Sequence, residues 1–371
     1  MKINPRASIA KIRPYVPGRP IREVVRELGM KDVIKLASNE NALGPSPKAL
    51  KAVKSYLDEI HRYPDGELVR ELKESLAGSL GVDSQEIVLG NGSNEILELV
   101  TRAFVEPQDE ILTSESTFLV YEALVHVAGA RGRFVPLKDY RYDLDSIAGQ
   151  ISEKAKVIFI SNPNNPTGTA LDRDEVNDFL RKVPERVLVV FDEAYYDFSE
   201  LKTFPDLMRD RRPNVVVVRT FSKSYGLAGL RIGYGVAMRE IARSMNKVRQ
   251  PFNVNSLALV AARAALEDTD HLTATRKMVE KGRAALEKSF QALGVSYVRS
   301  AANFVLFTLP LPSKQAAAAF LKQGVIVREM DAYGLKRALR VTVGTEAENK
   351  RFVKALETVI QLKPRVKERT A

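Results

Sequence analysis

Short runs of almost entirely apolar residues alternate with amphipathic segments along the chain as far as Pro251. The runs are rich in Val and Ile, and the segments between them repeat apolar residues at helical spacing. A strand that is apolar on both faces belongs to a buried, mostly parallel sheet with helices on each side. We therefore expect an α/β fold with strands near 86–89, 109–112, 156–160, 187–191, 215–218 and 232–236, and helices that include 94–105, 174–182 and 237–248.

After Pro251 the pattern changes to long helices interleaved with three short strands, which is typical of an α+β unit. The first residues form a Pro-rich arm that we expect to run extended and to join the small unit in part. We divide the chain into this arm at 1–35, a large domain at 36–255 and a small C-terminal α+β domain at 256–371. In the small domain we expect helices at 256–267, 271–293, 314–322 and 347–362, and strands at 304–308, 325–328 and 339–343.

The composition limits the kinds of functional site that the chain can contain. The chain has no Cys, no Trp and three His, so disulfides, thiol nucleophiles and Cys-based metal sites are excluded and we expect no metal. The net charge of +11 is spread along the chain among acidic residues, which argues against a nucleic-acid partner. With no apolar leader and no stretch of membrane-spanning length, we expect a cytoplasmic protein without membrane contact.

Polar clusters follow four of the expected strands, at the carboxyl ends where open parallel sheets bind ligands. In the first cluster, Gly92, Ser93 and Asn94 form a glycine turn that opens a helix. Such a turn is typical of phosphate binding, although ordinary helix capping explains it as well. The second cluster, at 161–168, has two Asn-Pro pairs and is either a simple turn or a rigid platform that aims an amide at a ligand.

The third and fourth clusters supply ionisable groups. Asp192 ends an apolar strand, where a buried carboxylate needs a cationic partner or hydrogen-bond donors, as in a helix cap, a structural ion pair or a ligand contact. Lys223 follows another strand and lies among hydroxyls, with Arg231 beyond it, although most lysines are only solvated surface. Together the four clusters suit a phosphorylated aromatic aldehyde, and pyridoxal phosphate needs a lysine of this kind.

Several of these motifs, in this order, resemble those of the fold-type I aminotransferases, which bind pyridoxal 5′-phosphate. They are GSNE at 92–95, SNPNNPTG at 161–168, DEAY at 192–195, SK at 222–223 and Arg231. Four more segments resemble, more narrowly, the histidinol-phosphate aminotransferase family: PYVPG at 14–18, SNEN at 38–41, RYPD at 62–65 and LRVTVGT at 339–345. The resemblance covers nearly the whole chain and implies a seven-stranded, mostly parallel sheet in the large domain.

The resemblance implies the residues that bind the cofactor. Lys223 matches the lysine that binds it covalently and moves the proton during transfer, and Asp192 matches the acid that pairs with the pyridine nitrogen. Asn165 and Tyr195 match the donors to the phenolic oxygen. The other contacts that it implies are Phe118 and Ala194 on the two faces of the ring, and Gly92, Ser93, Asn94, Thr220, Ser222 and Arg231 around the phosphate.

The resemblance also implies a homodimer with shared active sites, because Tyr63 matches a residue that reaches the phosphate in the neighbouring subunit. Arg340 matches the residue that binds the substrate carboxylate, and one arginine can serve glutamate and a phosphate ester in turn. Arg328 is either a second charge for the ester or part of a surface ion pair. Tyr15 and Asn41 match an arm that closes over the substrate.

The function expected from this resemblance is transfer of the amino group of histidinol phosphate to 2-oxoglutarate, which gives imidazole-acetol phosphate and glutamate in histidine biosynthesis. The same motifs also suit an aromatic amino acid aminotransferase and, less well, a decarboxylase acting on a phosphorylated amino acid. A DNA-binding regulator that kept the fold is another alternative. Such regulators usually append a helix-turn-helix module, for which this chain has no spare length.

Overall fold

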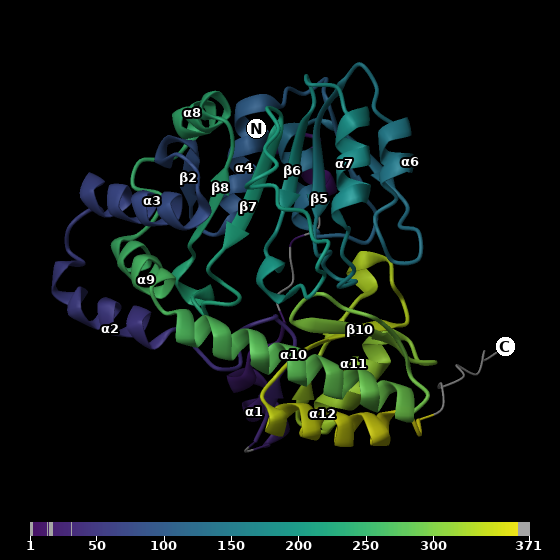
Figure 1. The fold of residues 1–371 in the computed structure, drawn as a ribbon. Helices are drawn as coiled ribbons and strands as arrows, with labels where there is room; N and C mark the ends of the chain where they lie inside the picture. The colour runs from purple at the N-terminus through teal and green to yellow at the C-terminus, as the bar shows by residue number, and fades with distance from the viewer. Residues whose placement is uncertain (1–2, 13, 15–17, 31, 363–371) are drawn as a thin grey trace.

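The computed structural model describes residues 3–12, 14, 18–30 and 32–362, and the structural statements below concern these residues. The strands of the central sheet are β2 (Ile87–Gly90), β3 (Glu110–Ser114), β4 (Arg131–Val135), β5 (Ala155–Ser161), β6 (Leu188–Asp192), β7 (Val215–Thr220) and β8 (Gly233–Val236). Within the described residues they form one seven-stranded sheet in the order β2-β8-β7-β6-β5-β3-β4, in which β8 alone runs antiparallel to its neighbours (Figure 1). The expected α/β fold with a mostly parallel sheet is confirmed.

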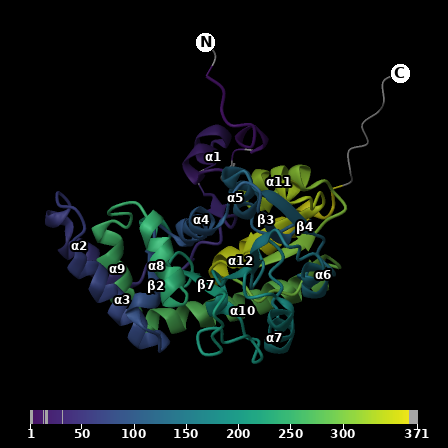
Figure 2. The ribbon, with the colours of Figure 1, turned by 90° about the horizontal axis from the view of Figure 1, so that it is seen from above.

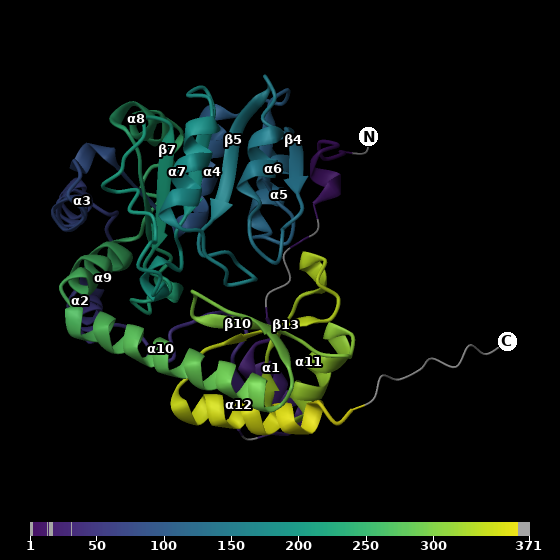
Figure 3. The same ribbon diagram turned by 45° about the vertical axis from the view of Figure 1, so that its right-hand side comes forward.

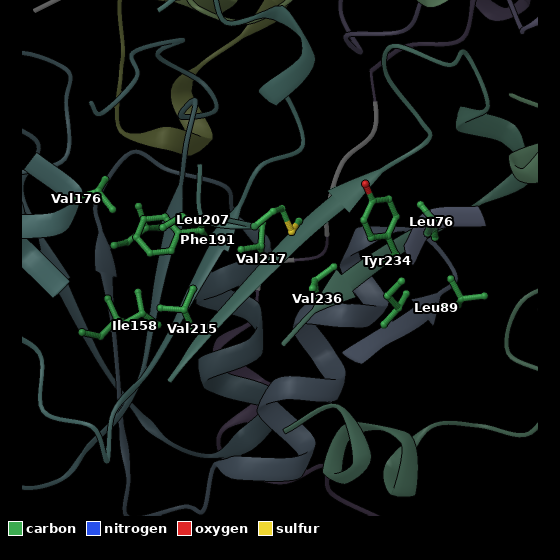
Figure 4. Packing of buried hydrophobic residues seen from close by; sticks show 14 of the residues in the cluster. Leu76, Leu89, Ile158, Val176, Phe191, Leu207, Val215, Val217, Tyr234 and Val236 are labelled. Carbon is green, nitrogen blue, oxygen red and sulfur yellow. The ribbon is translucent and has the colours of Figure 1, made fainter. Parts of the chain in front are cut away.

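Alternate residues of each central strand pack on opposite faces of this sheet, as the period of two in a strand requires. In β7, Val215 and Val217 belong to one apolar cluster, whereas Val216 and Val218 belong to another. Figure 4 shows the first cluster, which extends across the sheet from Leu89 to Ile158. Because both faces are buried, the strands inside the sheet are largely apolar, and this is why they could be located from the sequence; the edge strand β4 is mostly exposed.

Helices cover both faces of the central sheet (Figure 2). Residues of α3 (Gly66–Leu80), α6 (Leu144–Gly149), α7 (Arg173–Lys182) and α9 (Ser256–Leu266) bury apolar side chains in the first cluster, and α2 (Pro47–Ser55) packs on α9. Residues of α4 (Ser93–Phe104), α5 (Val120–Ala128) and α8 (Arg239–Val248) do so in the second cluster. The shorter 3₁₀ turns are η1 (Ile9–Lys11), η2 (Leu57–Glu59), η3 (Ser84–Glu86), η4 (Tyr196–Phe198), η5 (Ala228–Leu230) and η6 (Asp331–Tyr333).

The small unit contains a second, antiparallel sheet of β9 (Ser296–Val298), β10 (Phe304–Thr308), β12 (Arg328–Glu329) and β13 (Ala338–Thr342), in the order β12-β13-β10-β9. One face of it packs on α10 (Thr269–Ala292), α11 (Ser313–Lys322) and α12 (Glu346–Val359) through a core that includes Phe290, Phe307, Phe320 and Phe352. The opposite face is turned toward the large sheet, and Leu306 and Arg340 lie side by side on it. The N-terminal α1 (Ile21–Leu28) precedes β1 (Ile34–Lys35), which pairs in parallel with β11 (Val325–Ile326).

The change from one core to the other does not coincide with residue 256. Helix α9 contributes Ala258, Leu259 and Ala262 to the core of the large sheet, whereas Leu286 and Phe290 of α10 belong to the core of the small unit. The 24-residue helix α10 therefore takes the chain from one unit to the other, as Figure 3 shows. Among the described residues, no helix is both long and apolar enough to cross a bilayer.

Candidate active site

A cavity of about 400 Å³ lies between the central sheet and the face of the small sheet that carries Arg340. It is lined by side chains from the carboxyl ends of β5, β6 and β7, from the start of α4, and from β13. Of the residues expected at the site, those that line it are Ser93, Asn94, Phe118, Asn165, Asp192, Ala194, Tyr195, Thr220, Ser222, Lys223, Arg231 and Arg340. The crossover topology of the central sheet brings most of these residues to one place, and the small sheet adds Arg340 from the opposite side.

The start of α4 forms one end of the cavity. Gly92 precedes the helix with φ +80°, a conformation that favours glycine, and a side chain there would collide with the guanidinium of Arg231. Arg231 in turn donates to Ser222 Oγ at 3.4 Å, and the Thr220 hydroxyl donates to the same atom at 3.0 Å. A helix N-terminus, a guanidinium and two hydroxyls together form a site for an anion such as a phosphate group.

Asp192 ends β6 on the cavity side and is 3% exposed. Its carboxylate accepts hydrogen bonds from the Tyr121 hydroxyl at 3.0 Å and from the Ala194 amide at 3.1 Å. Burial raises the pKa of Asp192 to about 6, and these donors only partly oppose the shift. A carboxylate held in this way is stabilised by any ligand that presents a positively charged N–H group to it.

Lys223 lies beyond the end of β7, with its Nζ 5.6 Å from the centre of the Tyr195 ring. The ammonium donates to the carbonyl oxygen of Ser38 at 3.3 Å. Burial, and then the charge of Arg340, lower the pKa of Lys223 to about 8. The amine is therefore unprotonated in a much larger fraction of molecules at neutral pH than a surface lysine, as a nucleophile or base requires.

Arg340 projects from β13 into the cavity and is 5% exposed. One terminal nitrogen donates to the Ala37 carbonyl at 2.9 Å and the other to the side-chain oxygen of Asn165. Its Nε has no hydrogen-bond partner within the described part of the chain. Because a buried N–H that lacks a partner is costly, an anionic ligand at this guanidinium is strongly favoured.

The remaining expected site residues do not line this cavity. Arg328 lies directly opposite Arg340 in the β12–β13 register, so both side chains leave the same face of the sheet. Tyr63 is 78% exposed and stacks on Phe252 with 4.6 Å between ring centres. Asn41 donates instead to the Ser224 carbonyl and the Thr275 hydroxyl, at 2.9 and 3.0 Å. Tyr15 lies outside the described residues.

The structure adds cavity residues that the sequence analysis did not assign. The Tyr121 hydroxyl donates to Asp192, and its place three residues after Phe118, at the start of α5, was the available signal. Ser38, Asn39 and Tyr333 also line the cavity, from segments whose position cannot be read from local patterns. In the described residues, no group of three or more His, Asp or Glu is placed to hold a metal ion.

Comparisons with known proteins give matches over most of the chain. The model of the family "Aminotransferase class I and II" matches residues 31–356. Histidinol-phosphate aminotransferase 1 of Nitrosococcus oceani is 47% identical over 96% of this chain and 96% of its own, and the histidinol-phosphate aminotransferase of Moorella thermoacetica is 47% identical over 96% and 92%. The crystal structure of histidinol-phosphate aminotransferase from Sinorhizobium meliloti in complex with pyridoxal-5′-phosphate is similar with a TM-score of 0.86, at 28% identity over 96% of this chain and 97% of that one.

Proposed function

This chain belongs to the class I and II aminotransferase family, and we propose that it transfers the amino group of histidinol phosphate to 2-oxoglutarate in histidine biosynthesis. The products are imidazole-acetol phosphate and glutamate, and the cofactor is pyridoxal 5′-phosphate. The main observation is that Lys223, Asp192 and Arg340, from three distant elements, line one buried cavity. The printed names of the curated relatives support the choice of substrate.

The residues of the cavity fit pyridoxal phosphate. The start of α4 with Arg231 would hold its phosphate, and the buried carboxylate of Asp192 would accept from its pyridine nitrogen. Asn165 and Tyr195 would donate to its phenolic oxygen, with Phe118 and Ala194 against the two faces of its ring. When bound, the cofactor supplies the electron-withdrawing ring that stabilises the carbanion left by proton removal.

The protein's own part in the reaction is to move one proton and to bind two anions. Lys223 Nζ, with its lowered pKa, accepts the proton from the substrate α-carbon and delivers it to C4′ of the cofactor, and it moves a proton in the opposite direction in the second half-reaction. Arg340 binds the carboxylate of glutamate in one half-reaction and the phosphate ester of histidinol phosphate in the other. Arg328, on the same face of the sheet, would add a second charge for the dianion.

We also propose that the enzyme is a cytoplasmic homodimer with shared active sites. Tyr63 and Phe252 form an exposed aromatic pair, and Leu57 and Ile60 nearby are exposed as well. Exposed apolar groups of this kind are typical of a protein interface, where Tyr63 would reach the phosphate site of the other subunit. Light scattering should give the mass of two chains, and Tyr63→Ala should weaken cofactor binding without loss of folding.

The choice of substrate is tested by comparing amino donors to 2-oxoglutarate. Steady-state assays with histidinol phosphate and with phenylalanine should show ping-pong kinetics and a much higher kcat/KM for histidinol phosphate. A higher kcat/KM for phenylalanine would assign the chain to the aromatic aminotransferases instead. Release of CO₂ without transfer to 2-oxoglutarate would indicate a decarboxylase.

A further inference from the structure

Three consecutive residues, 37–39, contact three of the functional side chains at once. The segment enters the cavity between the two units, after β1 and before α2. The carbonyl of Ala37 accepts from Arg340 at 2.9 Å, the carbonyl of Ser38 accepts from Lys223 at 3.3 Å, and the side-chain amide of Asn39 donates to the hydroxyl of Tyr195 at 3.0 Å. The first two contacts use the backbone, which any residue provides, so Asn39 is the position at which the side chain itself is required.

Asn39 is held in place by the small unit. It is 1% exposed, and its φ of +55° lies in the left-handed region, which Asn tolerates better than most residues. Its backbone N–H donates to Thr342 Oγ1 at 2.9 Å, and the Thr342 hydroxyl donates to Asn39 Oδ1 at 3.1 Å. The side-chain amide of Asn303 donates to the backbone carbonyl of Asn39 at 3.1 Å. Thr342 lies two residues after Arg340 on β13, so both side chains are on the same face.

This pattern fixes which atom of the amide faces Tyr195. The Thr342 oxygen already accepts from the Asn39 backbone, so its own proton has a partner only if the side-chain atom beside it is the oxygen Oδ1. The nitrogen Nδ2, which can only donate, is then the atom directed at the Tyr195 hydroxyl. A hydroxyl that accepts from Asn39 retains its single proton for a partner in the cavity, which Tyr195 lines.

We propose that Asn39 is a positioning residue that directs the hydroxyl proton of Tyr195 into the cavity, toward the phenolic oxygen of the cofactor. The proposal rests on the function proposed above, in which Tyr195 donates to that oxygen. A donor stabilises the deprotonated oxygen, so the bound cofactor should titrate at a lower pH than it would without Asn39. Because the Thr342 hydroxyl orients the Asn39 amide, the direction of the Tyr195 proton also depends on β13, the strand that contains Arg340.

The sharpest variant is Asn39→Asp, which keeps the size and the acceptor for Thr342 but replaces the donor that faces Tyr195 with an acceptor. The Tyr195 hydroxyl would then donate to residue 39 and no longer into the cavity. The measurement is the midpoint of the pH titration of the bound cofactor's visible absorption, which needs no amino donor. We expect Asn39→Asp to raise this midpoint by about one pH unit, the size expected for loss of a hydrogen bond to a charged oxygen.

A double-mutant cycle with Tyr195→Phe separates this role from others. If Asn39 acts through the Tyr195 hydroxyl, Asn39→Asp should add little to the shift already produced by Tyr195→Phe. An equal shift in both backgrounds would mean that the new charge acts directly on the cofactor or on Lys223, and the proposal would be wrong. No shift in the wild-type background would overturn it as well.

A neutral pair of variants tests the same idea without a new charge. Thr342→Val removes the hydroxyl that orients the Asn39 amide, whereas Thr342→Ser keeps it. We expect the Val variant to raise the titration midpoint and the Ser variant to leave it unchanged, and equal midpoints in the two would contradict the proposal. Thermal unfolding of the ligand-free variants checks that each is folded. If the wild-type protein binds no pyridoxal phosphate at all, the proposed function fails rather than the role of Asn39.

Discussion

Two acidic residues at the end of β6, Asp192 and Glu193, are adjacent in sequence and equally buried, but they have opposite surroundings. Glu193 forms an ion pair with Arg219 at 2.8 Å, and the Arg219 guanidinium also lies 3.7 Å from the centre of the Tyr196 ring. On the cavity side, within the described structure, no ion pair joins Asp192 to the nearby Lys223. The pKa of Asp192 is raised to about 6 and that of Lys223 lowered to about 8. Glu193 therefore has a buried cation as its partner, although its Oε1 accepts no hydrogen bond in the described structure, whereas the charges of Asp192 and Lys223 face a cavity that a ligand can enter.

The largest expected effect is on catalysis and comes from a change at Lys223, on the cavity side. Lys223→Ala removes the group that moves the proton, so we expect transfer from histidinol phosphate to fall by at least about a thousandfold. Turnover is measured with saturating pyridoxal phosphate, and a circular dichroism spectrum like that of the wild type controls for folding. Activity within tenfold of the wild type would show that another group moves the proton.

A change in the Glu193–Arg219 ion pair should lower the stability of the protein rather than its catalytic rate. Glu193→Ala leaves Arg219 buried without its partner, and we expect the free energy of unfolding to fall by about 3 kcal/mol. Chemical denaturation gives this value, while kcat per folded molecule should stay close to that of the wild type. A large loss of kcat with an unchanged free energy of unfolding would mean that Glu193 serves catalysis rather than stability.

Variants at Arg340 test whether substrate binding requires the planar guanidinium or only its positive charge. Arg340→Lys keeps a positive charge but loses the two-pronged guanidinium, so we expect KM for both glutamate and histidinol phosphate to rise about a hundredfold, with a smaller change in kcat. Arg340→Met, which removes the charge, should raise KM further. Unchanged KM values in the Lys variant would indicate that Arg340 does not bind either anion.

The smallest expected effect is a gain in stability. The pKa of Asp192 in the folded, ligand-free protein is raised above its unfolded value, so its contribution to stability is present at low pH and is lost as the pH rises through 6. Asp192→Asn removes this penalty of about 3 kcal/mol but weakens the hydrogen bonds from Tyr121 and Ala194, so we expect the ligand-free variant to be more stable than the wild type by about 1 to 2 kcal/mol above pH 6. Denaturation of both proteins below pH 4 and above pH 6 checks this, because the penalty develops between the unfolded and folded pKa values of Asp192. A difference that does not change with pH would contradict the assigned pKa.

The sequence was most informative where function depends on local order. Asp192 ends one apolar strand and Lys223 lies three residues after another, so their place at the carboxyl edge of a parallel sheet follows from the pattern alone. Strand β4 was not expected, because it lies at the sheet edge and most of Arg131–Val135 is exposed, which leaves no apolar run. The sequence also did not show in which core α9 packs, because an amphipathic pattern indicates the buried face of a helix but not the core that this face contacts.

Residues 37–39, which form part of the cavity wall, show more clearly which features could not be predicted from the sequence. Asn39 contacts Tyr195, 156 residues away, and Thr342, 303 residues away, and no periodicity relates positions so far apart. The resemblance to known aminotransferases supplied Arg340 and Asn41, but the structure directs Asn41 to Ser224 and Thr275 instead of the cavity. Long-range polar contacts of this kind depend on how the two units pack, which local sequence does not specify.

The most direct test of the central claim is to find where the cofactor becomes attached. The protein is loaded with pyridoxal phosphate, reduced with borohydride, digested and analysed by peptide mass spectrometry. We predict a single modified peptide, in which the added mass lies on Lys223, and no such modification in Lys223→Ala. Attachment to another lysine, or a label spread over surface lysines, would contradict the assignment of this cavity as the active site.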